Sequence, residues 1–410
     1  MGVRLDMLTE KLKLERYQMS LLFHPRPPLF AAISSDDADL VQTLLEQNAA
    51  NPNEFFDSNQ RTYTPISWVS SSAMNIRLTN RQRIIEILVQ FGGNPALHSP
   101  LLECDELAVA DYLIQIGARV DQTVPPPYPF NGTALVKRAI NYKTGYVELL
   151  LRNGASPNSR TGSGDTIPLH IAKNLSTATE THSNEIFDLL GSSGGDLNVY
   201  DRHGWMSLMY VVSAHEDAAD GSPTRDFWNT ASILIRRGAD ISARDRESNT
   251  ILHIALGNPA VRIPRSPLIR GLLANGADLL ITSFNLRGHS PLHIVAHTSF
   301  SVYDYWGDTV GLAALLIARG ADVNMRDNEG ETPLLREVKY ICPPPGTVSP
   351  YPPPRPGSPR RQIALDLLNM LLRNGGDKKI RDISGRDATG VARAARQYGT
   401  DVLPILARYG

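Results

Sequence analysis

The chain is poor in cysteine and has no long apolar segment. Only Cys104 and Cys342 occur in 410 residues, and they lie far apart, so we expect neither a disulfide framework nor a cysteine-based zinc site. No apolar run approaches the ~18–20 residues of a membrane-spanning helix. The N-terminus also lacks the hydrophobic region of a signal peptide. We therefore expect a protein of a reducing compartment, the cytoplasm or the nucleus, that does not enter a membrane.

An excess of charge of one sign is also lacking. Lys and Arg number 41 against 42 Asp and Glu, which gives a formal net charge of −1. Without a strong positive field, the whole chain gives no case for binding nucleic acid or an anionic membrane surface. We expect neither as a partner.

Motifs of well-known chemistry are missing as well. The sequence contains no phosphate-binding loop, no Gly-x-Ser-x-Gly nucleophile elbow and no His-Glu-x-x-His zinc motif. The nearest glycine-rich stretch, residues 191–195, follows a predicted helix instead of preceding one. We expect no enzyme activity and no cofactor.

The sequence does contain a recurring phrase. Its clearest copy runs from Gly320-Ala321-Asp322 through a polar turn to Thr332-Pro333-Leu334. One residue, almost always Gly, closes each copy: Asn48, Gly92, Gly117, Gly154, Gly194, Gly238, Gly276, Gly320, Gly375 and Gly410. Such recurrence indicates many small stacked units, each of which buries its apolar face against its neighbours.

Each copy has a physical rationale. An apolar segment such as 312–317 predicts a helix, and the following Gly ends it by adopting a left-handed conformation. The pair Thr332-Pro333 then opens the next helix, because the hydroxyl accepts a free helix N–H and Pro needs no donor at the first position. The pattern predicts an all-α chain of about ten helix-turn-helix units, with no sheet beyond pairing at the turn tips.

Three of these openings resemble a family motif. Segments 168–172 (Pro-Leu-His-Ile-Ala), 252–255 (Leu-His-Ile-Ala) and 291–294 (Pro-Leu-His-Ile) are similar to the Thr-Pro-Leu-His-x-Ala of the ankyrin repeat, whose period is about 33 residues. The resemblance covers about residues 27–410, with insertions in most copies and a truncated third copy. It implies an ankyrin-repeat solenoid.

The histidines of these motifs, His170, His253 and His293, occupy one position in successive units. Stacked helices lie about 8–10 Å apart, whereas one zinc ion needs nitrogens within about 2.1 Å of it. We therefore expect no metal site. The resemblance implies that these side chains hydrogen-bond the backbone between repeats.

The predicted organisation is an N-terminal helix or cap over residues 1–26, followed by the repeat array over 27–410. The N-terminal helix either covers the first repeat or binds a partner. Insertions are expected mostly between the two helices of a unit. The longest, residues 342–361, contains nine of the 29 prolines and is predicted to be a mobile loop that the array tolerates losing.

The resemblance implies a non-enzymatic scaffold or adaptor that acts as a monomer and binds a protein on its concave face, built from turn tips and first helices. The residues predicted to bind the partner are Tyr200, Asp201, His203, Trp205, Arg244, Arg246, Phe284, Arg287 and Arg326. For Trp205 the alternative is packing between repeats.

Short linear motifs suggest further partners. Pro125-Pro126-Pro127-Tyr128 matches a WW-domain ligand, which leaves open a second function: a regulatory or substrate-recognition subunit coupled to ubiquitin transfer. The segment from Pro350 through Pro353 to Arg355 matches an SH3 ligand, and Ser358 followed by Pro359 resembles a proline-directed kinase site. For each motif the alternative is a Pro-rich surface loop without a reader. A third possibility is a sensor whose catalytic part lies on another chain.

Overall fold

The computed structural model describes residues 26–409, with gaps at 59–60, 72–75, 124–131, 177, 215–226, 258–265, 299–308, 345–352 and 396–397. The predicted cap over residues 1–26 therefore lies almost wholly outside the described residues, as does the WW-ligand segment. The chain divides into two compact units, residues 1–167 and 168–410, and each is described by itself.

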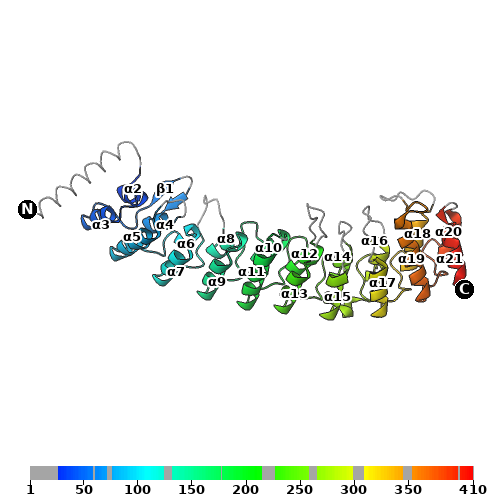
Figure 1. Cartoon of the computed structure of the whole chain (residues 1–410). Helices are drawn as coiled ribbons and strands as arrows, with labels where there is room; N and C mark the ends of the chain where they lie inside the picture. The colour runs from blue at the N-terminus through cyan, green and yellow to red at the C-terminus, as the bar shows by residue number, and fades with distance from the viewer. Residues whose placement is uncertain are drawn as a thin grey trace, which may run out of the picture. The chain divides into compact units, whose positions relative to one another are not determined.

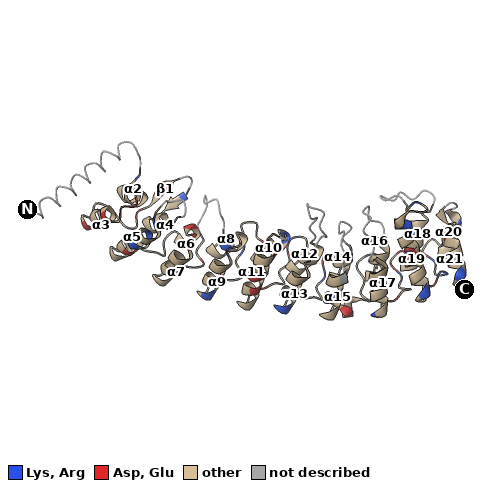
Figure 2. Cartoon of the chain, in the orientation of Figure 1, with Lys and Arg blue, Asp and Glu red and all other residues tan. Residues whose placement is uncertain are grey.

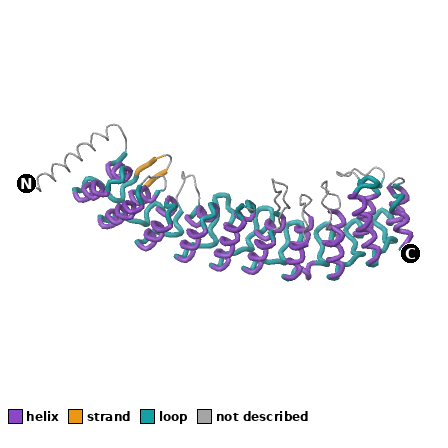
Figure 3. Tube along the Cα trace, in the orientation of Figure 1, coloured by secondary structure: helices purple, strands orange, loops and turns teal. Residues whose placement is uncertain are grey.

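Helices account for nearly all regular structure in the described residues (Figures 1 and 3). Unit 1 contains α2 (Pro28–Ser34), α3 (Ala38–Glu46), β1 (Phe56–Ser58), β2 (Arg61–Tyr63), α4 (Pro65–Ser70), α5 (Leu78–Gln90), α6 (Pro100–Glu103), α7 (Leu107–Gln115), α8 (Ala134–Ile140) and α9 (Thr144–Arg152). The unit boundary falls inside α10 (Ile167–Lys173). The antiparallel pair β1–β2 is a turn tip, as predicted.

Unit 2 continues the alternation of a first and a second helix. It contains α11 (Glu180–Ser192), α12 (Ser207–Ser213), α13 (Trp228–Arg236), α14 (Ile251–Gly257), α15 (Ser266–Ala274), the 3₁₀ turn η1 (Ala277–Leu280), α16 (Pro291–Thr298), α17 (Thr309–Ala318), α18 (Pro333–Ile341), α19 (Pro359–Arg373), α20 (Ala388–Ala394) and α21 (Val402–Arg408). From α2 to α21 the described helices form ten successive pairs. The predicted all-α solenoid is confirmed.

Like helices stack on like within each unit. In unit 2 the first helices α12, α14, α16, α18 and α20 pack in that order, and second helices such as α11 and α13, or α17 and α19, pack on one another. Each layer is therefore buried by its neighbours in the sequence, which is how a solenoid builds a continuous core.

The predicted helix ends are confirmed by the backbone. All nine described closing residues, from Asn48 to Gly375, have a positive φ. Thr64 and Thr332 cap α4 and α18 by accepting from the N–H of the third residue that follows. Arg152 and Arg236 lie in the last turns of α9 and α13, where Figure 2 shows basic residues at the helix ends and where they complement the helix dipole.

An Asn bridge repeats between neighbouring pairs. Asn198 donates to the carbonyl of Gly238 at 3.0 Å, and its side-chain oxygen accepts from the N–H of Asp240 at 2.7 Å. Asn324 makes the same two bonds to Gly375 and Asp377. One side chain thus satisfies the end of one second helix and the start of the next turn, which fixes the register of adjacent pairs.

The truncated third copy is held by a buried arginine. Helix α6 has only four residues, so its carbonyls need partners from outside the helix. The guanidinium of Arg138, 2% exposed, donates to the carbonyls of Leu101 and Leu102 at 3.3 and 3.2 Å and pairs with Asp105. A side chain of α8 thereby replaces the hydrogen bonds that the missing turns of α6 would make.

The two ends of the Pro-rich segment, residues 342–361, are packed against other parts of the chain, which the prediction of a mobile loop did not include. Cys342 is buried and its thiol donates to the carbonyl of Tyr398 at 3.0 Å. Burial raises the pKa of Cys342 to about 12. Pro354 is buried, and its carbonyl accepts from Arg361 at 3.0 Å. Helix α19 begins at Pro359, inside the expected loop. Both ends of the predicted loop are therefore packed, and its C-terminal bound is corrected to Ser358; that the array tolerates its loss stays a prediction.

Arg361 is the main anchor of this segment. Its side chain is 1% exposed, and Nε donates to Asp401 Oδ2 at 2.6 Å. This ion pair joins the start of α19 to the start of α21, so it helps to hold the last two helix pairs together.

We expect Arg361→Ala to lower the free energy of unfolding by about 3 kcal/mol. The value is at the low end for a broken buried ion pair, because the Asp401 carboxylate stays 35% exposed. Arg355→Ala, an exposed change in the same segment, should stay within about 0.5 kcal/mol. Urea denaturation of both variants checks this, and equal effects would contradict the anchoring role.

Candidate functional site

The candidate site is a row of five turns in unit 2 that share one hydrogen-bond pattern. Each begins with an Asp or Asn whose Oδ1 accepts from the backbone N–H two and four residues later, at 2.8–3.1 Å. These residues are Asp201, Asp245, Asn285, Asp327 and Asp382. The carbonyl four residues later accepts from the N–H of the same residue. The backbone of each tip is therefore closed from inside.

The second oxygen of three of the four turn carboxylates, those of Asp201, Asp327 and Asp382, faces a basic group. Asp201 Oδ2 lies 2.7 Å from the Tyr210 hydroxyl and 3.0 Å from Lys173 Nζ. Burial would raise the pKa of Asp201, but hydrogen bonds from Tyr210, the Trp205 N–H and Lys173 hold it well below its usual range. Similarly, burial is outweighed at Asp382, where bonds from Lys339 and the Arg386 N–H lower the pKa to about 2.

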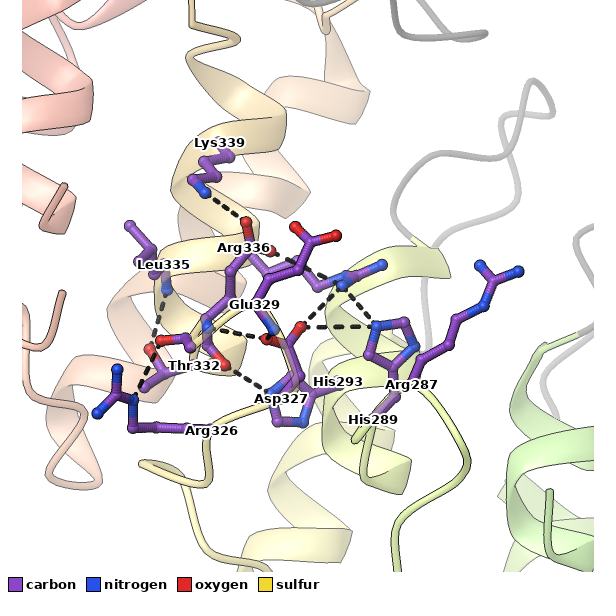
Figure 4. A network of polar contacts seen from close by, with 12 residues as sticks. Arg287, His289, His293, Arg326, Asp327, Glu329, Thr332, Leu335, Arg336 and Lys339 are labelled. Atoms are coloured by element: carbon purple, nitrogen blue, oxygen red, sulfur yellow. Dashed lines mark hydrogen bonds and ion pairs between the residues drawn. The ribbon is translucent and has the colours of Figure 1, made fainter. Parts of the chain in front are cut away.

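Figure 4 shows the most extended of these networks. Asp327 Oδ2 lies 3.3 Å from Arg336 Nη1 and 3.6 Å from His289 Nε2. Lys339 pairs with Glu331 and, at 2.6 Å, with Asp382 of the next turn. The side chains of Asp327 and Asp382 are each 1% exposed. These acids fix the turns and are not available to a partner.

The histidines carry the contact from one pair to the next. His253 Nδ1 accepts from the N–H of Thr250 at 3.2 Å, and its Nε2 donates to the carbonyl of His289 at 2.8 Å. His293 likewise accepts from the N–H of Ser290 and donates to the carbonyl of Glu331 at 3.1 Å. For these two residues the predicted bond to the backbone of the next repeat is present. His170 is half-buried in α10.

The tip row consists of the exposed positions that flank the five turn acids and amides. The residues before them are Tyr200, Arg244, Phe284, Arg326 and Arg381, and the next residues are Arg202, Arg246, Leu286, Asn328 and Ile383. His203, Glu247, Arg287, Glu329 and Ser384 follow. Seven of the nine predicted partner residues belong to this row, on turns that contact one another: Arg244 donates to the carbonyl of Phe284 at 3.0 Å, and Arg326 to that of Arg381 at 2.9 Å.

Two predicted partner residues lie elsewhere. The prediction for Asp201 is wrong, because its side chain is 1% exposed and its oxygens are taken by the turn, Tyr210 and Lys173. Trp205 is half-buried, and its ring centroid lies 5.1 Å from that of Tyr210. Because Tyr210 lies on α12 of the same repeat, this contact does not test the alternative of packing between repeats.

A hollow of about 490 Å³ lies beside the tip row, over α12, α14 and α16. Trp205 and Arg287 line it, together with the polar Asn249 and His289 and the apolar Ile254 and Ile294. Gly257 at the end of α14 also lines it. The first helices and the tips therefore form one recessed surface, on which two predicted partner residues meet.

Of the residues that directly follow the turn acid or amide, the sequence reasoning named only Arg246 and missed Arg202, Leu286, Asn328 and Ile383. Arg202, Leu286 and Ile383 are exposed, the last two by 65% and 76%. Aligning the copies on the turn Asp or Asn, instead of on the closing Gly, would have placed all of them in one column.

The linear motifs are only partly described. The segment from Pro125 to Tyr128 and Pro350 lie outside the described ranges. Pro353 is half-buried and Arg355 is exposed. Ser358 caps α19: its hydroxyl accepts from the N–H of Arg361 at 3.2 Å and donates to the carbonyl of Arg355 at 2.7 Å. Arg361 is buried. A kinase that recognises Arg361 as part of the site around Ser358 therefore requires the start of α19 to unfold.

The described ranges lack both a membrane-spanning helix and a metal-binding cluster. They contain no helix that is long and apolar enough to cross a membrane. The same residues include no group of three or more His, Cys, Asp or Glu side chains placed to hold a metal ion.

We expect His293→Ala to cost about 1–3 kcal/mol of unfolding free energy, because the mutation leaves the buried Glu331 carbonyl without this donor. His182→Ala, an exposed change on α11, is the matched control and should be neutral. Thermal denaturation of both variants measures the difference, and an unchanged His293→Ala melting temperature would refute the role.

Stability should also fall in mild acid. Burial lowers the pKa of His253 to about 4 in the folded chain. In the unfolded chain this histidine has its ordinary pKa of about 6.5, so it binds a proton near pH 6.5 that the folded chain does not bind. The free energy of unfolding then decreases as the pH falls from about 6.5 towards 4, by up to about 1.4 kcal/mol per pKa unit. His253→Asn should flatten this part of the pH profile in urea denaturation. The same slope in both proteins would show that other groups cause it.

Comparisons with known proteins agree with this architecture. Residues 287–328, which run from within the third turn of the row to within the fourth, match the family model "Ankyrin repeat". The chain is 28% identical over 200 residues to the nuclear factor NF-kappa-B p105 subunit of Gallus gallus. This match covers 42% of the chain and 18% of the relative, so the chain spans less than a fifth of that protein.

Among solved structures, the chain is similar to the ankyrin repeat domain of Bcl-3, a member of the IkappaB protein family, with a TM-score of 0.46 and 18% identity over 70% of this chain and all of that one. It is also similar to the ankyrin repeat protein EF0377, with a TM-score of 0.43 and 22% identity over 59% of this chain and 97% of that one. The family match lies within the series of helix pairs, closed turns and bridging histidines described above, and the chain is accordingly an ankyrin-repeat protein.

Proposed function

We propose that this chain is a non-enzymatic scaffold or adaptor of the cytoplasm or nucleus that binds a protein partner on the tip row and the adjoining hollow of unit 2. Ankyrin repeats are in general protein-interaction modules. On this proposal the chain acts as a monomer and needs no cofactor.

One observation carries the proposal: exposed aromatic, aliphatic and Arg side chains stand on turns whose backbone is closed from inside. Tyr200 is 47% exposed and Phe284 60%, beside the exposed Arg244 and Arg287. Tyr and Arg are among the residue types enriched at the energetic centres of interfaces. Since the turns are already ordered, binding requires little further loss of backbone entropy.

A catalytic role has no comparable support. The charged groups with strongly shifted pKa values in this region, Asp201 and Asp382, are saturated by hydrogen bonds from their own and neighbouring turns. Their arrangement serves to hold the turns, and the surface they leave free is extended and not convergent.

Site-specific cross-linking tests the proposal. We expect a photoreactive p-benzoylphenylalanine at Phe284 to capture a defined protein band from lysate, because this position projects from the tip row. The matched control places the same group at Arg270, an exposed residue of the second helix α15. Equal or stronger capture at Arg270 would place the interface on the second helices and would refute the proposed site.

A further inference from the structure

We infer that the tip row of unit 2 receives an acidic, extended segment of the partner protein. The inference rests on the proposed function and adds the chemistry of the partner. It starts from the arginines of the row. The row contains six exposed arginines: Arg202, Arg244, Arg246, Arg287, Arg326 and Arg381. Arg381 lies 3.9 Å from Asp387, and within the described part of the chain none of the other five lies within ion-pair distance of a carboxylate.

The turns have carboxylates nearby, but they face inward. Asp201, Asp327 and Asp382 have side chains 1% exposed and are bound to backbone N–H groups and to Lys173, Arg336 and Lys339. Of the fifteen positions of the row, only Glu247 and Glu329 present an exposed acid. In these three turns the acids are therefore neutralised on the inner surface, and the outer surface of the row keeps an excess of positive charge.

Several of these arginines are held in place. Arg244 donates to the carbonyls of Ser248 and Phe284, each at 3.0 Å. Arg246 lies across Gly204 of the preceding turn, so closely that a Cβ added there would lie 2.6 Å from its Cγ. Guanidinium groups positioned in advance lose less entropy when they bind a carboxylate, and their planar donors suit it.

The spacing of the row favours an extended chain. Neighbouring helix pairs pack about 8–10 Å apart, and an extended chain advances about 3.3 Å per residue. A carboxylate at every third residue of such a segment therefore meets successive turns. The exposed Phe284 and Leu286 lie in the same row and provide apolar contacts for the residues between the acids.

A nucleic acid fits the row less well than an acidic protein segment does. A single strand carries one phosphate on every nucleotide, so it cannot avoid Glu247 and Glu329, which interrupt the arginines. A protein segment can place isolated carboxylates beside the arginines and apolar side chains elsewhere.

The test uses the full-length chain and a fluorescein-labelled peptide of about twelve residues built from the repeat Glu-Gly-Phe, whose acids recur at about the 10 Å spacing of the turns. A Lys-Gly-Phe peptide of the same length and a single-stranded oligonucleotide of similar length are the comparison probes. Fluorescence anisotropy gives each Kd. We expect the acidic peptide to bind more tightly than both other probes, and its affinity to fall as salt is raised.

The key variant is R202Q/R246Q/R287Q, and the control is R236Q/R270Q/R319Q, which removes three exposed charges from the second helices and their ends. We expect the first to weaken binding of the acidic peptide by about fivefold or more and the second to leave it unchanged, with both variants retaining the wild-type melting temperature.

Three results would overturn the inference. The Lys peptide binds as tightly as the acidic peptide or more tightly; the acidic peptide does not bind; or the oligonucleotide binds more tightly than the acidic peptide, and R202Q/R246Q/R287Q abolishes its binding. If cross-linking at Phe284 still captures a partner in any of these cases, the interface stands and only the acidity of the partner is wrong. If cross-linking at Phe284 also fails, the proposed function itself fails.

Discussion

The structure of unit 2 depends on one interaction, the bond between a buried Asp or Asn side chain and the backbone N–H groups of its own turn. Asp201, Asp245, Asn285, Asp327 and Asp382 each close a turn in this way. The closed turn presents a carbonyl to the preceding histidine, as with His253 and His289. A local bond thus becomes the link between one pair of helices and the next, and it repeats because the sequence repeats.

The same interaction shapes the surface. The buried carboxylates of Asp201, Asp327 and Asp382 are bonded to backbone N–H groups and to Lys173, Arg336 and Lys339. Arginines such as Arg246 and Arg287, in contrast, are exposed. A chain with a net charge of only −1 can therefore carry a locally basic row. Whole-chain charge describes solubility and long-range steering, but a binding surface is decided by which charges are buried and which are exposed.

Irregular copies are held by arginines at the points where the repeat pattern breaks. Arg138 takes the carbonyls of the shortened α6, and Arg361 secures the Pro-rich connection before α19 through Asp401. Both are nearly fully buried. Buried charges of this kind are costly unless they are fully bonded, which explains why both guanidinium groups bind carbonyls as well as a carboxylate.

The sequence alone determined the fold, because the fold is made of local signals: the closing residues from Asn48 to Gly375, the Thr-Pro openings, and the apolar helices between them. It also determined that the turn tips project, which placed Arg244 and Phe284 on the surface. It did not determine that Asp201 is buried or that Pro354 and Arg361 are packed, since each depends on a partner 7 to 40 residues away. Only the tertiary structure showed which charges are neutralised, because burial and pairing arise where neighbouring repeats pack on one another.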